Sequence, residues 1–241
     1  MDFELTKQQQ LARRVAREFA LQELEPHAQE LDETMAFPRD ALQKMAGLGF
    51  MGISIPKEYG GAALDSISSA IVVEEISRVC AAVGLCVTVH NGVAVYPVLQ
   101  FANASQKEKY LPQLAAGNVI GAFSLTEANA GSDAGSVETT AVKNETHYIL
   151  NGTKIFVTNG GVCDVALIFA LTSSPVNKLQ SSVFIVESKF PGFLRGELED
   201  QSIRLLGRIE SPAEFEQIVV RRRGNELLRL GQVASVADGF A

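Results

Sequence analysis

The sequence has few cysteines and no excess of basic residues, and both shortages limit what the protein can do. Its three cysteines, Cys80, Cys86 and Cys163, form no CxxC pair or other metal-ligand spacing, and an odd count argues against a disulfide framework. We therefore expect reduced, mostly buried thiols and no metal site. Lys and Arg number 21 against 28 Asp and Glu, which gives a net charge of -7 at pH 7. This balance disfavours non-specific binding to nucleic acid, which requires basic residues to neutralise phosphates.

No targeting segment is visible at the N-terminus. The opening residues MDFELT are acidic and contain no arginine, whereas a mitochondrial presequence is Arg-rich and acid-poor. Residues Thr6 to Gln9 already have the pattern of a capping box, which opens a helix. We therefore expect a bacterial cytoplasmic protein, or one that is already processed.

Charge is absent from the long run Val79 to Gln106, which exceeds the length that a membrane-spanning helix requires. His90, Asn91 and Pro97 interrupt its interior, and each polar group there would cost roughly 2 kcal/mol or more in lipid without a partner. We therefore favour a helix buried among other helices and expect no membrane span. His90 then needs a hydrogen-bond partner inside the protein.

Helical signals fill the first half of the chain. Apolar residues recur every four positions from Leu11 through Leu31, and that helix should end before Pro38, near which a second begins. Asp65 is placed to cap another helix, and a capping box at 105–108 opens a further one that Gly117 ends. We predict an N-terminal all-α domain over residues 1–118.

Short β-branched and aromatic runs replace the helical period after Gly117. The predicted strands are Val119–Leu125, Val137–Lys143, His147–Leu150, Lys154–Thr158, Val165–Leu171, Ser182–Glu187 and Phe215–Arg221. Asn151 and Gly152 predict a two-residue hairpin turn that joins the third of these strands to the fourth. We predict an all-β module, a sandwich or a barrel, over residues 119–230. Helices followed by strands make the fold class α+β with segregated domains.

One motif is rejected on its context. Residues 47–52 match GxGxxG letter for letter, but a dinucleotide site needs a strand before the glycines and a helix after them. Here a predicted helix precedes them and an extended segment follows. The match therefore does not predict nucleotide binding.

Two other stretches carry the functional signal. Phe123–Asp133 reads FSLTEANAGSD and, taken alone, is as compatible with a surface turn as with a ligand loop; Lys154–Gly161 reads KIFVTNGG. With Asn151 and Gly152 leading into the second, both resemble motifs of the acyl-CoA dehydrogenase family, in their order and at their separation. Further stretches at 56–61, 74–78 and 106–112 resemble the family too, most of all its short-chain, butyryl-CoA-type branch.

The resemblance implies FAD as cofactor. It implies that Leu125 and Thr126 lie at the pyrimidine side of the flavin, that Thr158 hydrogen-bonds near N5, and that Phe156 replaces the usual Trp against the ring. It implies that Ser132 touches both FAD and the CoA portion of the substrate. The complete set of cofactor-binding candidates is Phe123, Ser124, Leu125, Thr126, Gly131, Ser132, Phe156, Val157 and Thr158.

The implied reaction converts an acyl-CoA to a trans-2-enoyl-CoA. In the family the base is a Glu of a third, helical-bundle domain; residues 231–241 would only begin that domain, so we assign no catalytic residue here. The family also implies an electron-transfer flavoprotein as acceptor and a tetramer, which a fragment need not form. The alternative is a non-catalytic remnant that binds flavin, acyl-CoA or a partner.

Two departures from the family pattern are visible. Ala128-Asn129 replaces a Pro-Gly type pair, which makes that loop less rigid. Arg221-Arg222-Arg223 follows the last predicted strand, and we interpret these arginines as a solvated edge.

Overall fold

The computed structural model describes residues 4–145, 147–172, 180–190, 219–223 and 226–229. The chain divides into two compact units, Met1–Glu199 and Asp200–Ala241. The described part of the second unit is an antiparallel hairpin of β6 (Val219–Arg223) and β7 (Glu226–Arg229). The three arginines therefore lie within a strand instead of after one. Residues 215–218 of the strand predicted there lie outside the described residues.

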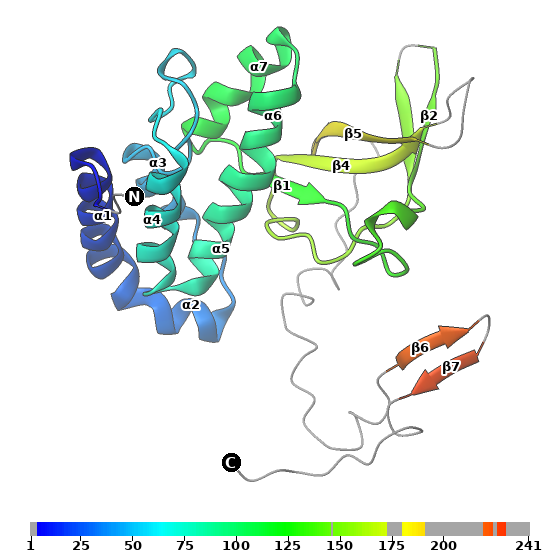
Figure 1. The fold of residues 1–241 in the computed structure, drawn as a ribbon, viewed down its shortest axis with the longest axis horizontal. Helices are drawn as coiled ribbons and strands as arrows, with labels where there is room; N and C mark the ends of the chain where they lie inside the picture. The colour runs from blue at the N-terminus through cyan, green and yellow to red at the C-terminus, as the bar shows by residue number, and fades with distance from the viewer. Residues whose placement is uncertain (1–3, 146, 173–179, 191–218, 224–225, 230–241) are drawn as a thin grey trace. The chain divides into compact units, whose positions relative to one another are not determined.

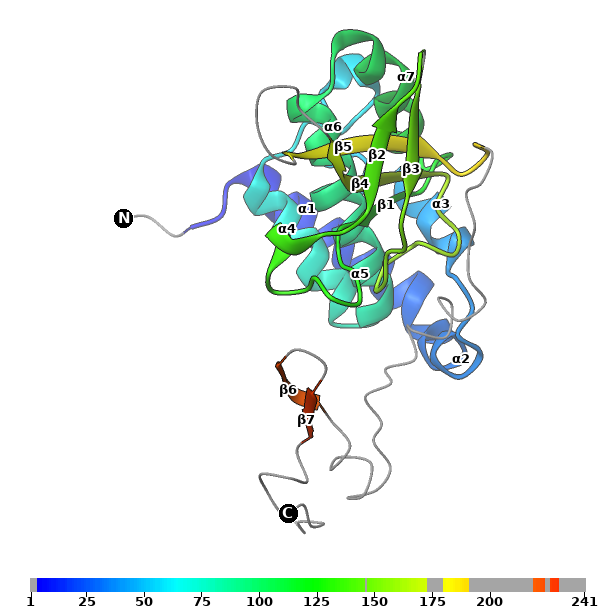
Figure 2. The ribbon, with the colours of Figure 1, turned by 90° about the vertical axis from the view of Figure 1, so that its right-hand side faces the viewer.

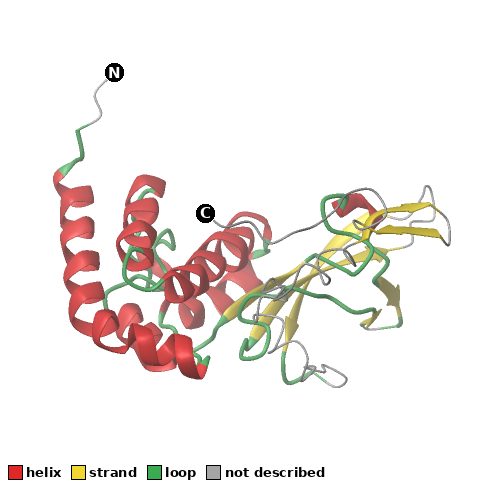
Figure 3. Cartoon of the chain, turned by 90° about the horizontal axis from the view of Figure 1, so that it is seen from below, coloured by secondary structure: helices red, strands yellow, loops and turns green. Residues whose placement is uncertain are grey.

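The first unit begins with helices and continues with strands, as the α+β prediction requires, and its α-helices and strands occupy separate regions (Figure 3). Its α-helices are α1 (Lys7–Phe19), α2 (Ala28–Thr34), α3 (Arg39–Gly47), α4 (Ser66–Ser77), α5 (Ala81–Val89), α6 (Tyr96–Phe101) and α7 (Ala104–Ala115). Two π-helical segments, η1 (Ala20–Leu24) and η4 (His90–Val95), and the short 3-10 helices η2 (Glu25–His27), η3 (Lys57–Tyr59) and η5 (Ala134–Ser136) complete the set.

The first helix begins as predicted. Thr6 and Gln9 form a reciprocal capping box, in which each side chain accepts a hydrogen bond from the other residue's backbone N–H. The predicted single helix over Leu11–Leu31 is a continuous helical path, but it passes through η1 and η2 before α2. Pro26 lies in η2 and has no N–H to donate, which accounts for a break in the α-helical ladder there.

Helix caps are confirmed at one predicted position and shifted at another. Asp65 caps α4, because its Oδ1 accepts from the Ser68 N–H at 2.7 Å. For α7 the prediction was wrong by two residues: Asn103, not Ser105, is the N-cap, with Gln106 as its capping-box partner. Asn is as good a cap as Ser, and Ser105 instead donates to Asn103 Oδ1 at 3.1 Å. Gly117, at φ 67°, ends α7 as expected.

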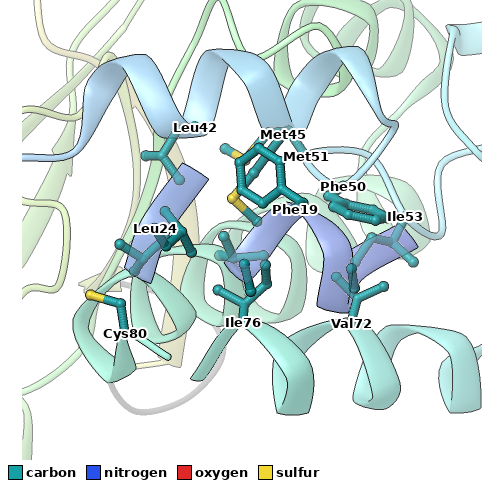
Figure 4. Close-up of a cluster of buried hydrophobic side chains, with 14 of the residues drawn as sticks. Phe19, Leu24, Leu42, Met45, Phe50, Met51, Ile53, Val72, Ile76 and Cys80 are labelled. Carbon is teal, nitrogen blue, oxygen red and sulfur yellow. The ribbon is translucent and has the colours of Figure 1, made fainter. Parts of the chain in front are cut away.

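The helices enclose an apolar core. Phe19 and Leu24 from the first helical path, Met45 from α3 and Ile76 from α4 lie around a shared interior (Figure 4). The glycines of 47–52 lie where α3 ends and turns follow, so a helix and not a strand precedes them, as the sequence predicts.

The uncharged run folds as α5, η4 and α6 in succession. Ala81–Phe101 is long and apolar enough, by length and composition, to cross a membrane, and 44% of its most apolar window is buried within the structure. Its polar residues His90 and Asn91 are buried and hydrogen-bonded to neighbouring segments of the same unit. That environment matches a core helix, and His90 has the partners that its burial requires.

Five strands form one mixed sheet in the first unit (Figures 1 and 2). They are β1 (Gly121–Ser124), β2 (Thr140–Lys143), β3 (Tyr148–Asn151), β4 (Val165–Thr172) and β5 (Gln180–Glu187). The strand β4 pairs with β5 antiparallel along its whole length. Its other edge pairs in parallel first with β1 and then with β2, which also pairs with β3. Closure of the described strands into a barrel or sandwich stays a prediction.

The predicted hairpin at Asn151 and Gly152 is wrong. The hairpin joins β2 to β3 instead, where Asn144 N–H donates to the His147 carbonyl. Gly152 is required for a different reason: a Cβ there would lie 2.2 Å from Thr139 Oγ1. Lys154–Thr158 is also not a strand, because Phe156 has φ 56°, which no extended strand permits.

Candidate functional site

The first motif, Phe123–Asp133, leaves the sheet between two strands. It starts in β1, departs after Ser124, and the chain rejoins the same edge of β4 only at Thr140. A tight turn closes its middle, where Glu127 and Ala130 exchange backbone hydrogen bonds at 3.0 and 3.1 Å. The loop that the sequence predicts from small residues is therefore held at the edge of a sheet.

The second motif, Lys154–Gly161, follows β3 and runs back along the first. Ile155 N–H donates to the Thr126 carbonyl at 2.9 Å. Four residues later, the Asn159 amide donates to the Gly121 carbonyl at 3.2 Å. The two motifs thus lie side by side and run in opposite directions, although Lys154 and Glu127 are 27 residues apart in the sequence.

A buried ion pair joins the motifs. Lys154 Nζ donates to Glu127 Oε1 at 2.7 Å and to the Leu125 carbonyl at 2.9 Å. Glu127 is 6% exposed and also accepts from the Thr139 N–H at 3.0 Å, the Glu138 N–H and the Thr139 hydroxyl. Burial alone would raise the pKa of Glu127, but these donors outweigh it and lower the pKa to about 2.

The sequence prediction missed this pair. Neither Glu127 nor Lys154 was a site candidate, although both lie inside the motifs. Two opposite charges in otherwise weakly charged motifs were the signal available, since buried charges require partners. The pair fixes Leu125 and Thr126 beside the start of the second motif.

Three hydroxyl groups of the motifs are available to a ligand. Thr126 and Thr158 are half-buried and Ser132 is exposed. None of the three hydroxyls bonds to another residue in the part of the chain that the structure describes. Such groups at the surface can donate to or accept from a bound molecule.

Phe156 is the exposed aromatic residue of the second motif. Its side chain is 67% exposed and its backbone lies at φ 56°, in a region that bulky residues rarely adopt. Strained positions of this kind cluster at ligand-binding segments. An exposed aromatic ring can pack against a flat aromatic ligand.

Some of the remaining candidate residues pack within the unit, and others lie at its surface. Phe123 packs edge-to-face on Phe169 with ring centroids 5.3 Å apart, and Ser124 is buried. Val157 packs on the small cluster of Ala122, Cys163 and Ala166. Leu125 is half-buried, and Gly131 is exposed with no atom within 4 Å of where a Cβ would be. Space at Gly131 lets a ligand approach the backbone.

The described residues hold no group of three or more His, Cys, Asp or Glu side chains that could bind a metal ion. The described residues contain no disulfide: Cys80 and Cys163 are buried thiols and Cys86 is a half-buried thiol.

Comparison with known proteins matches this arrangement. The model of the acyl-CoA dehydrogenase N-terminal domain matches residues 6–118, and that of the middle domain matches residues 122–210. The short-chain specific acyl-CoA dehydrogenase of Clostridium acetobutylicum is 44% identical over 220 residues, which are 91% of this chain and 58% of that protein. An acyl-CoA dehydrogenase of Bacillus subtilis is 46% identical over 195 residues, 81% of this chain and 52% of the relative.

Solved structures agree with the sequence comparisons. The butyryl-CoA dehydrogenase of Megasphaera elsdenii is 36% identical, with a TM-score of 0.73, over 80% of this chain and 51% of that one. The chain spans little more than half the length of these relatives. Two consecutive domain matches, high identity and a common fold lead to one assignment. The chain belongs to the acyl-CoA dehydrogenase family, whose N-terminal and middle domains it matches.

Proposed function

We propose that the two motifs form the face that binds FAD, as part of a protein that oxidises short-chain acyl-CoA thioesters. The observation that carries the proposal is the pairing of the motifs by Glu127 and Lys154, with the exposed ring of Phe156 and free hydroxyls beside them. Solved relatives include a Bacillus anthracis acyl-CoA dehydrogenase complexed with FAD, 35% identical with a TM-score of 0.73 over 78% of this chain.

Each candidate has a separate role in this proposal. Thr126 and the Leu125 amide donate to the pyrimidine edge of the ring, where negative charge gathers on reduction. Thr158 hydrogen-bonds near N5. Phe156 packs on the ring, while Gly131 and Ser132 leave room for phosphates and for the CoA portion of the substrate. Phe123, Ser124 and Val157 hold these groups in place through packing.

The chemistry is divided between the cofactor and a base. When bound, FAD would accept the hydride that leaves the β-carbon of the acyl group. A base must remove the α-proton, because a thioester α-hydrogen is only weakly acidic. We assign that base to none of the 241 residues. The residues of this chain orient the ring and stabilise charge on it.

The same proposal includes the domains and partners. We place an N-terminal helical domain at 1–118, a middle domain at 119–230, and the start of a third helical domain at 231–241. An electron-transfer flavoprotein is the proposed acceptor, supported by a chain 42% identical, with a TM-score of 0.76, in a structure of the electron transferring flavoprotein of Acidaminococcus fermentans. A homo-oligomer is proposed for the whole protein.

Anaerobic addition of butyryl-CoA to the FAD-loaded chain tests the activity. Loss of the visible flavin absorbance would show dehydrogenation. Bound flavin that stays oxidised is the result expected of residues that hold FAD without an assigned base, and a non-catalytic flavin-binding chain would give the same result. A chain that takes up no FAD at all would contradict the proposed site.

A further inference from the structure

Side chains hold Gly121, the first residue of β1, through both of its peptide groups. Its N–H donates to His90 Nδ1 at 3.1 Å, and its carbonyl accepts from the Asn159 amide at 3.2 Å. Gly121 lies two residues before the first motif, and Asn159 lies within the second. The base of one motif is therefore tied directly to the other.

The bond from Gly121 assigns the tautomer of His90. A backbone N–H can only donate, so Nδ1 must be the unprotonated acceptor and the proton resides on Nε2. Nε2 then donates toward the carbonyls of Met51 and Leu114, at 3.0 and 3.2 Å. His90 opens the π-helical segment η4 and is fully buried. It thus links the core helix to a loop, to α7 and to the sheet.

Asn159 is held through its amide N–H groups, while its Oδ1 accepts no hydrogen bond among the described residues. It is 4% exposed, and its amide donates to the Cys86 carbonyl of α5 at 3.2 Å as well as to Gly121. Its backbone lies at φ 65°, a left-handed conformation that Asn adopts more readily than most residues. Because Asn159 follows Thr158 directly, this conformation decides which way the Thr158 peptide turns.

Close packing leaves no freedom at the junction. A Cβ on Gly121 would lie 2.5 Å from Ala94 Cβ, so β1 lies against the core helix. His90, at the start of η4, and Asn159, in the second motif, both bond to Gly121. The position of one motif relative to the other is therefore set by their bonds to the core helix and not by the loops alone.

We propose that His90 and Asn159 clamp Gly121 and act as positioning residues, setting Thr158 relative to the Leu125–Thr126 edge of the flavin site. The inference rests on the proposed function, because it concerns the face on which FAD would bind. Neither residue needs to touch the cofactor.

A matched control exists in Asn91. It is 6% exposed, its Oδ1 accepts from Ile53 N–H at 3.1 Å, and its amide donates to the carbonyls of Phe50 and Val87. Asn91 is therefore a buried amide like Asn159, although its Oδ1 accepts a hydrogen bond and that of Asn159 accepts none among the described residues. None of the bonds of Asn91 reaches either motif. Replacing it reports the cost of losing a buried amide alone.

The test compares Asn159→Gly with Asn91→Ala in the full 241-residue chain. Glycine permits the left-handed backbone and removes the side chain together with its hydrogen bonds. Amide hydrogen exchange without cofactor should accelerate at least about tenfold over residues 121–126 and 154–161 in Asn159→Gly, since two hydrogen bonds are lost. Asn91→Ala should leave the exchange rates of those segments unchanged, even if both variants lower the unfolding temperature equally. Equal exchange in the two variants would overturn the clamp.

Titration with FAD supplies a second readout. Asn159→Gly should weaken binding about tenfold and alter the fine structure of the bound flavin spectrum, whereas Asn91→Ala should do neither. If the wild-type chain binds no FAD, the proposed function fails while the exchange comparison still decides the clamp. If Asn159→Gly does not fold, 15N NMR of the wild-type chain decides: a proton on His90 Nδ1 would contradict the clamp, and one on Nε2 supports it.

Discussion

At the scale of single residues, His90 should make stability depend on mild acidity. Burial lowers the pKa of His90 from its ordinary 6.5 to about 4, against which its bonds to Leu114 and Met51 act only in part. Between pH 4 and 6.5, His90 therefore binds a proton in the unfolded chain but not in the folded chain. Stability is complete above pH 6.5 and falls as the pH drops toward 4.

Unfolding by urea at pH 7, 6 and 5 measures this effect. His90→Gln, which cannot be protonated, should remove the part of the slope that belongs to one proton between pH 6.5 and 5. An unchanged slope in His90→Gln would show that His90 is not the group responsible.

The Glu127–Lys154 pair should behave as a buried pair does. Lys154→Met leaves a buried carboxylate without its counter-charge and should cost about 3–5 kcal/mol of unfolding free energy. The double variant Glu127→Gln/Lys154→Met should cost less than the sum of the single variants, as shown by urea denaturation. Lys44→Met, which removes an exposed ion pair with Glu23, is the control and should cost at most about 1 kcal/mol. A Lys154→Met cost no larger than that of Lys44→Met would contradict the buried pair.

At the residue scale, the sequence indicated the composition of each motif but not the contacts made where the two motifs meet. Thr126 and Thr158 lie on neighbouring segments as the resemblance requires. The partner of Glu127 could not be read from periodicity, because its contact with Lys154 depends on how the chain returns after β3. The same holds for His90, whose need for a partner was predicted but whose partners were not.

At the scale of elements, most strand positions follow from local composition. Each of β2 to β5 contains β-branched residues, and the run that includes β1 begins with Val119 and Ile120. Asn151-Gly152 misled because the same dipeptide that makes a hairpin turn also fits a close approach. Gly152 lies against Thr139, so a glycine is needed at this position because no side chain fits there, and not because the chain turns.

Two glycines of the motif region should therefore respond differently to substitution. Gly152→Ala places a Cβ against Thr139, whose hydroxyl bonds to Glu127, and should cost about 1–3 kcal/mol of stability. Gly131→Ala meets no atom within 4 Å and should leave the unfolding midpoint nearly unchanged while weakening FAD binding. Thermal unfolding and FAD titration of both variants separate the two effects. A loss of stability in Gly131→Ala would refute the open loop.

At the scale of the whole molecule, the order of helices and strands was predictable and the pairing of strands was not. Parallel pairing of β1 and β2 with one edge of β4 connects residues far apart in the chain, and local patterns do not encode such contacts. The uncharged helix is central to this arrangement, since His90 joins it to the start of the sheet. The site is thus a property of the joined helices and sheet and not of the motifs alone.

Amide hydrogen exchange of the 241-residue chain with and without FAD tests the central claim most directly. FAD should slow amide exchange in residues 123–133 and 154–161 together and leave the exchange rates of α1 to α4 unchanged. The variant Thr158→Val, which keeps the shape of the side chain but loses its hydroxyl, should require more FAD for the same protection. Protection confined to other segments, or none when FAD is in excess, would contradict a flavin site built from these two motifs.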